Sequence, residues 1–286
     1  SAASDVYKRQ HHHMGADWKM REILSEASRL IRNRHFALAV LIMLIAFSGY
    51  AACDWVFMYD WDVAYRSSSL QQTLGGIYFG GAMLVVPLCA ALPAGLAQVE
   101  ELQTNFIDYR IIRSSMPRYE VTKLASAFLA SGAAIALAFV FHALIWNILA
   151  TPCNPLENDY LAVPFADDCI FAPWQEIFYS LPIYLWIAAA AFFCGGVWGM
   201  ASVTAAMYTR DKLLSIAVPF CVYFLWSYGF PRVVLGVKRF PHPADLYNDG
   251  LTWNGFFSAL LVYGVLIVLL NALYGLRLFR RYRHGE

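Results

Sequence analysis

The chain has 286 residues, of which 59% are hydrophobic and only 14% carry a charge. Roughly a quarter of the residues in soluble domains are charged, so this composition excludes an ordinary water-soluble domain and favours a protein embedded in lipid. The formal net charge of +1 says nothing about nucleic acid, and the basic residues are spread over several segments rather than gathered in one groove.

The N-terminal region contains two predicted parts. Residues 1–13 end in three histidines and resemble the remnant of an expression tag, so we expect the natural chain to begin at Met14. In residues 14–35, apolar side chains recur at helical spacing and charged side chains occupy the other faces. This pattern predicts an amphipathic helix that lies in the membrane interface, with Trp18 at the level of the lipid headgroups.

Six stretches that lack Asp, Glu, Lys and Arg follow, and each can hold a membrane-spanning helix of about 20 residues. They are residues 36–53, 67–99, 124–156, 177–209, 213–231 and 255–276. In hydrocarbon every backbone amide must be bonded internally, and continuous apolar runs lack the alternation of barrel strands. We therefore expect an all-α integral membrane protein with one six-helix transmembrane domain over residues 36–279 and a tail at 280–286.

The distribution of Lys and Arg predicts the orientation of the chain. With the N-terminus inside, the predicted cytoplasmic segments contain fifteen of these residues, whereas the outer loops at 54–72, 151–176 and 230–252 contain four. Basic residues are retained on the cytoplasmic side of a membrane. We expect a multi-pass protein of a bacterial-type cytoplasmic (inner) membrane, with both termini cytoplasmic.

The second span is rich in glycine and proline, including Pro87 and Pro93. Proline removes a backbone donor and kinks or breaks a helix, which a membrane tolerates only where protein or water satisfies the freed carbonyls. This span should therefore face other helices or a pathway. The fourth span carries small residues, among them Gly195, Gly196 and Gly199, that predict a close packing seam.

The segment at residues 98–121 is the predicted cytoplasmic connection between the second and third spans. Val99, Leu102, Phe106, Tyr109 and Arg113 are spaced to share one face of a helix. Such a short amphipathic helix suits a docking surface for a partner subunit, and it equally suits an ordinary interfacial linker.

His142 is the titratable side chain expected inside a span. A proton relay, a ligand contact and a hydrogen-bonded packing residue are all open to it, and the absence of a partner carboxylate in the sequence pattern favours packing. In the outer loop at 151–176, Cys153 and Cys169 can form a disulfide in an oxidising exterior or remain free thiols.

Motifs for other chemistries are absent from the sequence. There is no metal-ligand spacing, no paired carboxylate motif within a span, and no phosphate-binding loop of the Gly-x-x-x-x-Gly-Lys-Ser/Thr type. An ion-coupled secondary transporter and an intramembrane enzyme remain alternatives, but the spans contain no acidic residue at mid-depth and only His142 as a titratable group.

The layout of the chain resembles a type-2 ABC transporter permease over residues 14–286. The residues that carry the resemblance are Glu101, Arg110, Ser114, Ser115, Pro117, Arg118 and Lys123. Asn105 stands where the family often has glycine.

This resemblance implies a permease, and we expect an exporter that works as a homodimer or with a similar permease. A separate ABC ATPase would bind ATP and Mg²⁺, and this chain would hold no cofactor or metal. The ATPase would contact a coupling helix through Glu100, Glu101, Phe106, Tyr109 and Arg110.

Overall fold

The computed structural model describes residues 20–58, 69–70, 73, 82–149, 181–227 and 253–284. These residues are helical apart from short turns, and they include no β-strand. The helices are α2 (Arg34–Met58), α4 (Ala82–Gln103), α5 (Phe106–Arg113), α6 (Met116–Leu149), α8 (Leu181–Thr209), α9 (Lys212–Phe224) and α11 (Trp253–His284). A further helical segment at residues 20–31 precedes α2. The all-α prediction is thus confirmed for the described part of the chain.

Five of these helices are long and apolar enough to cross a membrane. The apolar stretches lie at Arg34–Cys53, Ala82–Gln103, Met116–Leu149, Leu181–Thr209 and Phe257–Arg283. The predicted run at 213–231 forms a shorter apolar helix, Lys212–Ser227, and its remainder lies outside the described residues. The structure therefore supports a multi-pass membrane protein, while the count of six spans stays a prediction.

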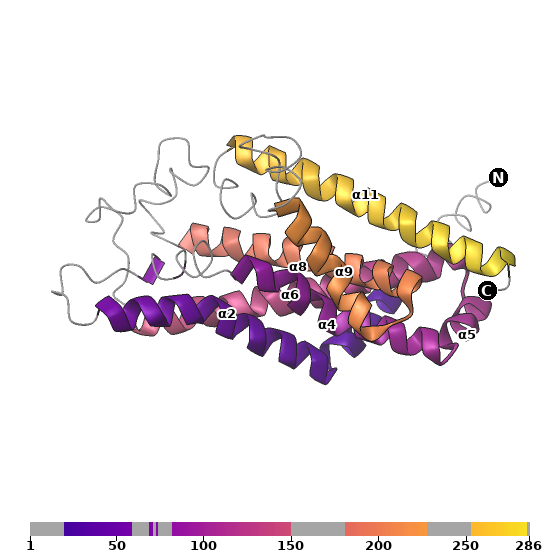
Figure 1. Cartoon of the computed structure of the whole chain (residues 1–286), viewed down its shortest axis with the longest axis horizontal. Helices are drawn as coiled ribbons and strands as arrows, with labels where there is room; N and C mark the ends of the chain where they lie inside the picture. The colour runs from indigo at the N-terminus through magenta and orange to yellow at the C-terminus, as the bar shows by residue number, and fades with distance from the viewer. Residues whose placement is uncertain are drawn as a thin grey trace, which may run out of the picture.

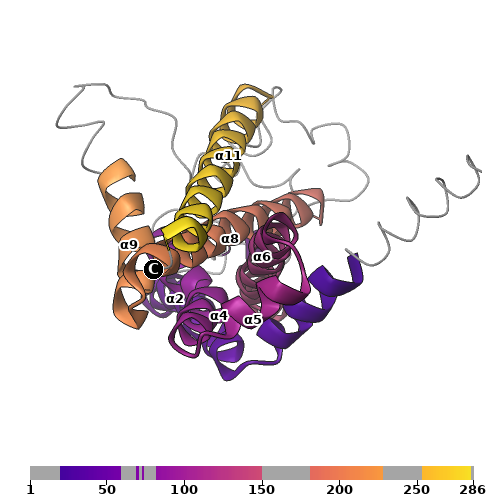
Figure 2. The same ribbon diagram turned by 90° about the vertical axis from the view of Figure 1, so that its right-hand side faces the viewer.

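Helix α4 lies at the centre of the bundle, against α2, α6, α8 and α9 (Figure 2). Its apolar window is the most buried of the five, as the prolines led us to expect. Both Pro87 and Pro93 lie inside this helix and are buried. Ser131 Oγ of α6 donates a hydrogen bond of 2.6 Å to the Ala90 carbonyl. A neighbouring helix thus supplies a donor to a backbone carbonyl close to Pro93.

Helices α6 and α8 approach each other closely along a seam of glycines. A Cβ added to Gly199 would lie 2.3 Å from Ser131 Oγ, and one added to Gly195 would lie 2.6 Å from Ile135 Cγ1. Both distances are too short for real carbon contacts, so only glycine permits this separation of the two backbones. The predicted packing seam of the fourth span is confirmed.

One end of the bundle is formed by α5, the start of α6 and the C-terminal end of α11 (Figure 1). We name it the basic end. Residues 20–31 pack there too, through ion pairs to α4, α5 and α6. Most of the Lys and Arg among the described residues lie at this end, in residues 20–31, α5, the start of α6 and the last turns of α11. This asymmetry is the one that the positive-inside rule requires of a single membrane face.

Candidate functional site

A tight reversal separates α4 from α5 at the basic end. Asn105 adopts a left-handed backbone conformation with φ 54°, which glycine and asparagine reach more readily than other residues. The expected single helical face is therefore divided: Val99 and Leu102 are buried on α4, whereas Phe106 begins a separate helix.

Helix α5 exposes large apolar side chains at a spacing of three residues. The exposed fractions are 44% for Phe106, 50% for Tyr109 and 84% for Ile112. On a helix, residues three apart are neighbours, so these side chains form one strip, which we name the α5 strip. A strip of this kind at the polar end of a membrane protein suits contact with another polypeptide.

A set of charged side chains around the buried Glu26, Glu101 and Lys123, which we name the ion-pair cluster, joins α5 to its surroundings. Its members are Glu26, Arg29, Glu101, Arg110 and Lys123. Lys123 Nζ lies 2.7 Å from Glu26 Oε1 and 2.6 Å from Glu101 Oε1. Arg29 bonds both carboxylates, and Arg110 Nη1 on α5 lies 3.0 Å from Glu26 Oε2. The cluster therefore ties residues 20–31, α4, α5 and α6 together.

The electrostatics of the cluster hold the Glu26 carboxylate ionised. Burial alone would raise the pKa of Glu26, but the charges of Lys123, Arg110 and Arg29 outweigh burial and lower its pKa from 4.5 to about 2. Likewise, Glu26 and Glu101 raise the pKa of Arg29 against the opposing effect of its burial. Since Glu26, Glu101 and Lys123 are buried and each has more than one opposite partner, separating these helices would leave buried charges unpaired.

Two further contacts connect α5 and α4 to the C-terminal half of the chain. Asp108 on α5 accepts a hydrogen bond of 2.6 Å from the Tyr282 hydroxyl and lies 3.4 Å from Arg281, both on α11. Glu100 at the end of α4 lies 2.9 Å from Lys212 at the start of α9. Helix α5 is thus linked to the last helix as well as to residues 20–31.

A buried polar chain continues the cluster into the bundle. Tyr119 OH donates to Glu101 Oε2 at 3.4 Å. Gln98 Nε2 in turn donates to Tyr119 OH at 3.5 Å and to Tyr274 OH at 3.4 Å. These contacts connect α4, α6 and α11 inside the protein, so a displacement at the basic end has a polar route to the core.

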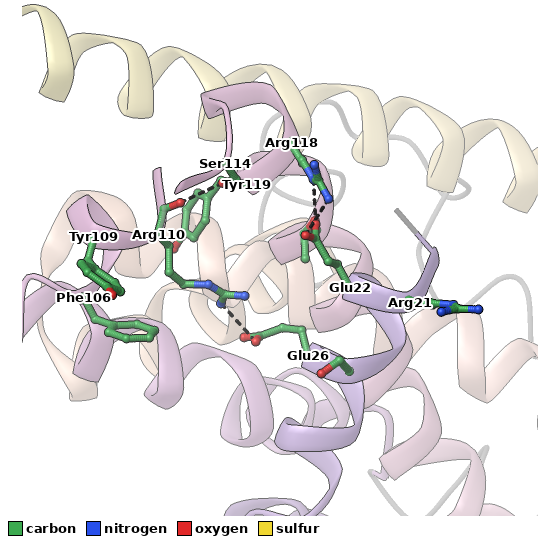
Figure 3. A pocket seen from close by; sticks show the side chains of 11 residues that line it. Arg21, Glu22, Glu26, Phe106, Tyr109, Arg110, Ser114, Arg118 and Tyr119 are labelled. Carbon is green, nitrogen blue, oxygen red and sulfur yellow. Dashed lines mark hydrogen bonds and ion pairs between the residues drawn. The ribbon is translucent and has the colours of Figure 1, made fainter. Parts of the chain in front are cut away.

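A pocket of about 450 Å³ opens beside the ion-pair cluster, between residues 20–31, α5 and the start of α6 (Figure 3). Phe106 and Tyr109 of the α5 strip line one side of it. On the other side Arg118 holds Glu22 through two hydrogen bonds of 2.8 and 2.6 Å. The pocket therefore combines aromatic and charged walls.

The structure separates the predicted coupling residues into two groups. Glu100 is exposed, as are Phe106 and Tyr109. Glu101 is 4% exposed and bound within the cluster, so it offers no surface to a partner in this conformation, and Arg110 is partly buried against Glu26. Their contact with an ATPase remains a prediction.

Of the predicted pathway residues, Pro87 and Pro93 lie in α4 and His142 lies in α6. The His142 Nδ1 is 3.0 Å from Ser48 Oγ of α2, and its ring lies beside Phe47. Their role in a pathway remains a prediction. The predicted pair Cys153 and Cys169 lies outside the described residues, and among the described ones no group of His, Cys, Asp and Glu could hold a metal ion.

Sequence reasoning missed the cluster members Glu26 and Arg29 and the α11 contact residues of Asp108. A signal for Glu26 was present, because it occupies the same helical face as Ile23, Ala27 and Leu30 and interrupts an apolar stripe. A carboxylate on such a face needs a buried cation, which Lys123 supplies. No comparable signal marks Arg281 as a partner of Asp108.

No protein-family model matches the chain, and no curated protein sequence matches it significantly.

Proposed function

We propose that this chain is the transmembrane permease subunit of an ATP-driven transporter, of the kind that type-2 ABC permeases represent. The observation that supports it best is α5: a short helix that exposes an apolar strip and is joined by ion pairs to residues 20–31, through Arg110 and Glu26, and to α11, through Asp108 and Arg281. A partner that grips the strip would move these segments together. In this proposal the partner is a separate ABC ATPase, which binds ATP and Mg²⁺.

The arrangement of contacts suggests how force would pass from the ATPase to the spans. Displacement of α5 acts on α6 and residues 20–31 through Arg110, Glu26 and Lys123, and on α11 through Asp108. Because Glu26 and Lys123 are buried, separating them is costly, so residues 20–31 and α6 move as a unit. Two copies, or this chain and a similar permease, would open a pathway between them and export a substrate.

The membrane arrangement that goes with this proposal has six spans and both termini in the cytoplasm of a bacterial-type cell, with residues 14–35 in the membrane interface. Concentration of Lys and Arg at the basic end supports this orientation. Residues 20–31 support the interfacial position, since Met20 and Leu24 are exposed by 58% and 54% and would face lipid while Glu26 faces the cluster.

Co-purification tests the proposal. The chain is co-expressed with ABC ATPases from the same genome, and retention of an ATPase and its hydrolysis of ATP are measured. We expect a stable complex that Ile112→Glu weakens by about tenfold or more, because the substitution would bury an unpaired carboxylate in the contact. Leu213→Glu is the control, since Leu213 is 74% exposed near the same end but lies outside α5. Failure of the unmodified chain to bind the ATPase, or equal effects of the two substitutions, would contradict the proposal.

A further inference from the structure

A second pocket, of about 360 Å³, lies between α6 and α8 at the opposite end of the bundle from the basic end (Figure 1). The two helices are closest along the seam of glycines, where a Cβ on Gly195 would lie 2.6 Å from Ile135 Cγ1. The pocket begins beyond this contact, at Phe139 of α6 and Ala188 of α8. The close approach of the two helices thus ends with the glycines, and the pocket occupies the space beyond them.

This pocket opens toward the membrane and carries no charge. Apart from Asn147 and Tyr184 its described lining is apolar, without Asp, Glu, Lys or Arg. Leu144 on α6 and Leu185 on α8 line the pocket and are exposed by 54% and 62%. Both helices are long and apolar enough to cross a membrane, so these exposed leucines face lipid. Such walls suit an apolar occupant from the bilayer, because an empty cavity would forfeit dispersion contacts.

The two polar residues of the pocket are joined through a buried serine. Tyr184 OH donates to Ser69 Oγ at 3.3 Å, and Ser69 Oγ donates to Asn147 Oδ1 at 3.2 Å. Ser69 is fully buried, so it holds the Asn147 amide from behind. Asn147 Nδ2 donates one hydrogen to the Ala143 carbonyl at 2.8 Å, and its second hydrogen has no acceptor among the described residues. The pocket therefore offers one uncharged donor to an oxygen of its occupant.

The depth of this donor corresponds to the ester groups of a lipid. The charge-free run of the third predicted span begins at Leu124. At a rise of about 1.5 Å per residue, Asn147 lies about 35 Å along α6 from that point, just beyond a hydrocarbon core of roughly 30 Å. The ester carbonyls of membrane lipids lie at this boundary. A partner helix, about 10 Å across, is too wide to enter the pocket, whereas a single acyl chain is narrow enough.

We propose that this pocket binds one acyl chain and the adjoining ester group of a membrane lipid, from the leaflet opposite the basic end. The chain would lie against Phe139, Leu144 and Leu185, and the ester carbonyl would accept the second Asn147 N–H. The bound chain would fill the space between α6 and α8 and stabilise their separation there. The inference goes beyond the proposed function and does not require an ATPase.

Photolabelling of the purified full chain in detergent tests this proposal. The probe is a phosphatidylcholine with a diazirine in one ester-linked acyl chain, and the labelled peptides are mapped by mass spectrometry. We expect saturable labelling of residues 139–147 and 181–188. Unlabelled diester phosphatidylcholine should compete about fivefold better than its diether analogue, because the ether lacks the carbonyl and loses one hydrogen bond of about 1 kcal/mol.

Two pairs of variants test the donor and the space. Asn147→Leu should abolish the preference for the diester, whereas Asn271→Leu should keep it. Asn271 Nδ2 makes the same 2.8 Å bond to the carbonyl four residues earlier, but it lies on α11 and does not line the pocket. Ala188→Phe should prevent labelling by filling the pocket. Ala189→Phe is its control, because Ala189 is exposed and does not line the pocket.

Three results would overturn the proposal. They are equal competition by the two lipids on the unmodified chain, equal labelling of Ala188→Phe and Ala189→Phe, and saturable labelling only outside residues 139–147 and 181–188. Melting temperatures in detergent show that each variant is folded, and the comparison of the two lipids on the unmodified chain needs no variant.

Discussion

Replacing Lys123 by methionine should destabilise the protein strongly. The Lys123 side chain is 4% exposed, and its Nζ lies within 2.7 Å of two carboxylates whose own side chains are 5% exposed. Methionine conserves much of the volume but leaves Glu26 and Glu101 with fewer partners. Breaking a buried pair by removing one partner costs about 3–5 kcal/mol. Because Arg29 and Arg110 remain, we expect the lower figure, about 3 kcal/mol.

Thermal unfolding in detergent, followed by tryptophan fluorescence, measures this effect. For a chain of this size, 1 kcal/mol corresponds to about 2–4 °C, so Lys123→Met should lower the melting temperature by about 6–12 °C. Lys212→Met is the matched control, because the Lys212–Glu100 pair has a similar distance of 2.9 Å but both side chains are 51% exposed. An exposed pair contributes less than about 1 kcal/mol.

A double variant tests whether the unpaired carboxylates cause the loss. Glu101→Gln in the Lys123→Met background removes one buried charge, so it should recover part of the lost melting temperature. The reasoning is refuted if Lys123→Met and Lys212→Met shift the melting temperature equally, or if Glu101→Gln lowers it further in the double variant.

Three other predictions concern the cluster, the seam and the turn. The lowered pKa of Glu26 stabilises the folded state by about 3 kcal/mol above pH 4.5, and this contribution is lost as the pH falls toward 2. Over this pH range the melting temperature of Glu26→Gln should therefore fall less steeply than that of the unmodified protein. Gly199→Ala should destabilise by about 1–3 kcal/mol, because its Cβ would meet Ser131, while Gly264→Ala meets no atom within 4 Å and should be neutral or stabilising in the same melting assay. Asn105→Gly should be tolerated, whereas Asn105→Val should lower the free energy of unfolding, measured by chemical denaturation, by about 1–2 kcal/mol because valine disfavours a φ of 54°. Equal effects of the two substitutions would contradict the left-handed conformation of Asn105.

Hydrophobic patterning explains why the positions of the long apolar helices could be predicted from the sequence. The charge-free run at 124–156 falls mostly within α6, and the run at 177–209 ends with α8 at Thr209. A long apolar run has few alternatives to a helix in lipid, so its position follows from composition alone. The glycine seam was also predictable, since closely spaced small residues in a membrane span typically allow another helix to pack closely.

Contacts between distant parts of the chain were not predictable in this way. Lys123 and Glu26 are separated by 97 residues, and Arg29 and Glu101 by 72. Periodicity gives the face on which a charge lies, but the identity of its partner depends on how helices pack. This is why Glu101, expected on a docking surface, lies inside the cluster, while Ile112, which was not singled out, is the most exposed member of the α5 strip.

The register of the segment after α4 illustrates the limit of spacing arguments. Val99, Leu102, Phe106 and Tyr109 fit a single helical face, yet the left-handed residue Asn105 ends one helix and starts another. A single backbone conformation thus turns two apolar positions inward and leaves two outward. Asparagine tolerates this conformation, so its presence was compatible with a break but did not require one.

Site-specific photocrosslinking from position 112 in intact membranes tests the central claim most directly, because Ile112 is 84% exposed on the surface assigned to the ATPase. The account predicts a crosslink between a photoreactive residue at position 112 and the ABC ATPase, and much weaker crosslinking from position 213. A photoreactive residue at position 112 that is reached only from outside the cell, or that captures no nucleotide-hydrolysing partner while the protein still transports, would contradict it.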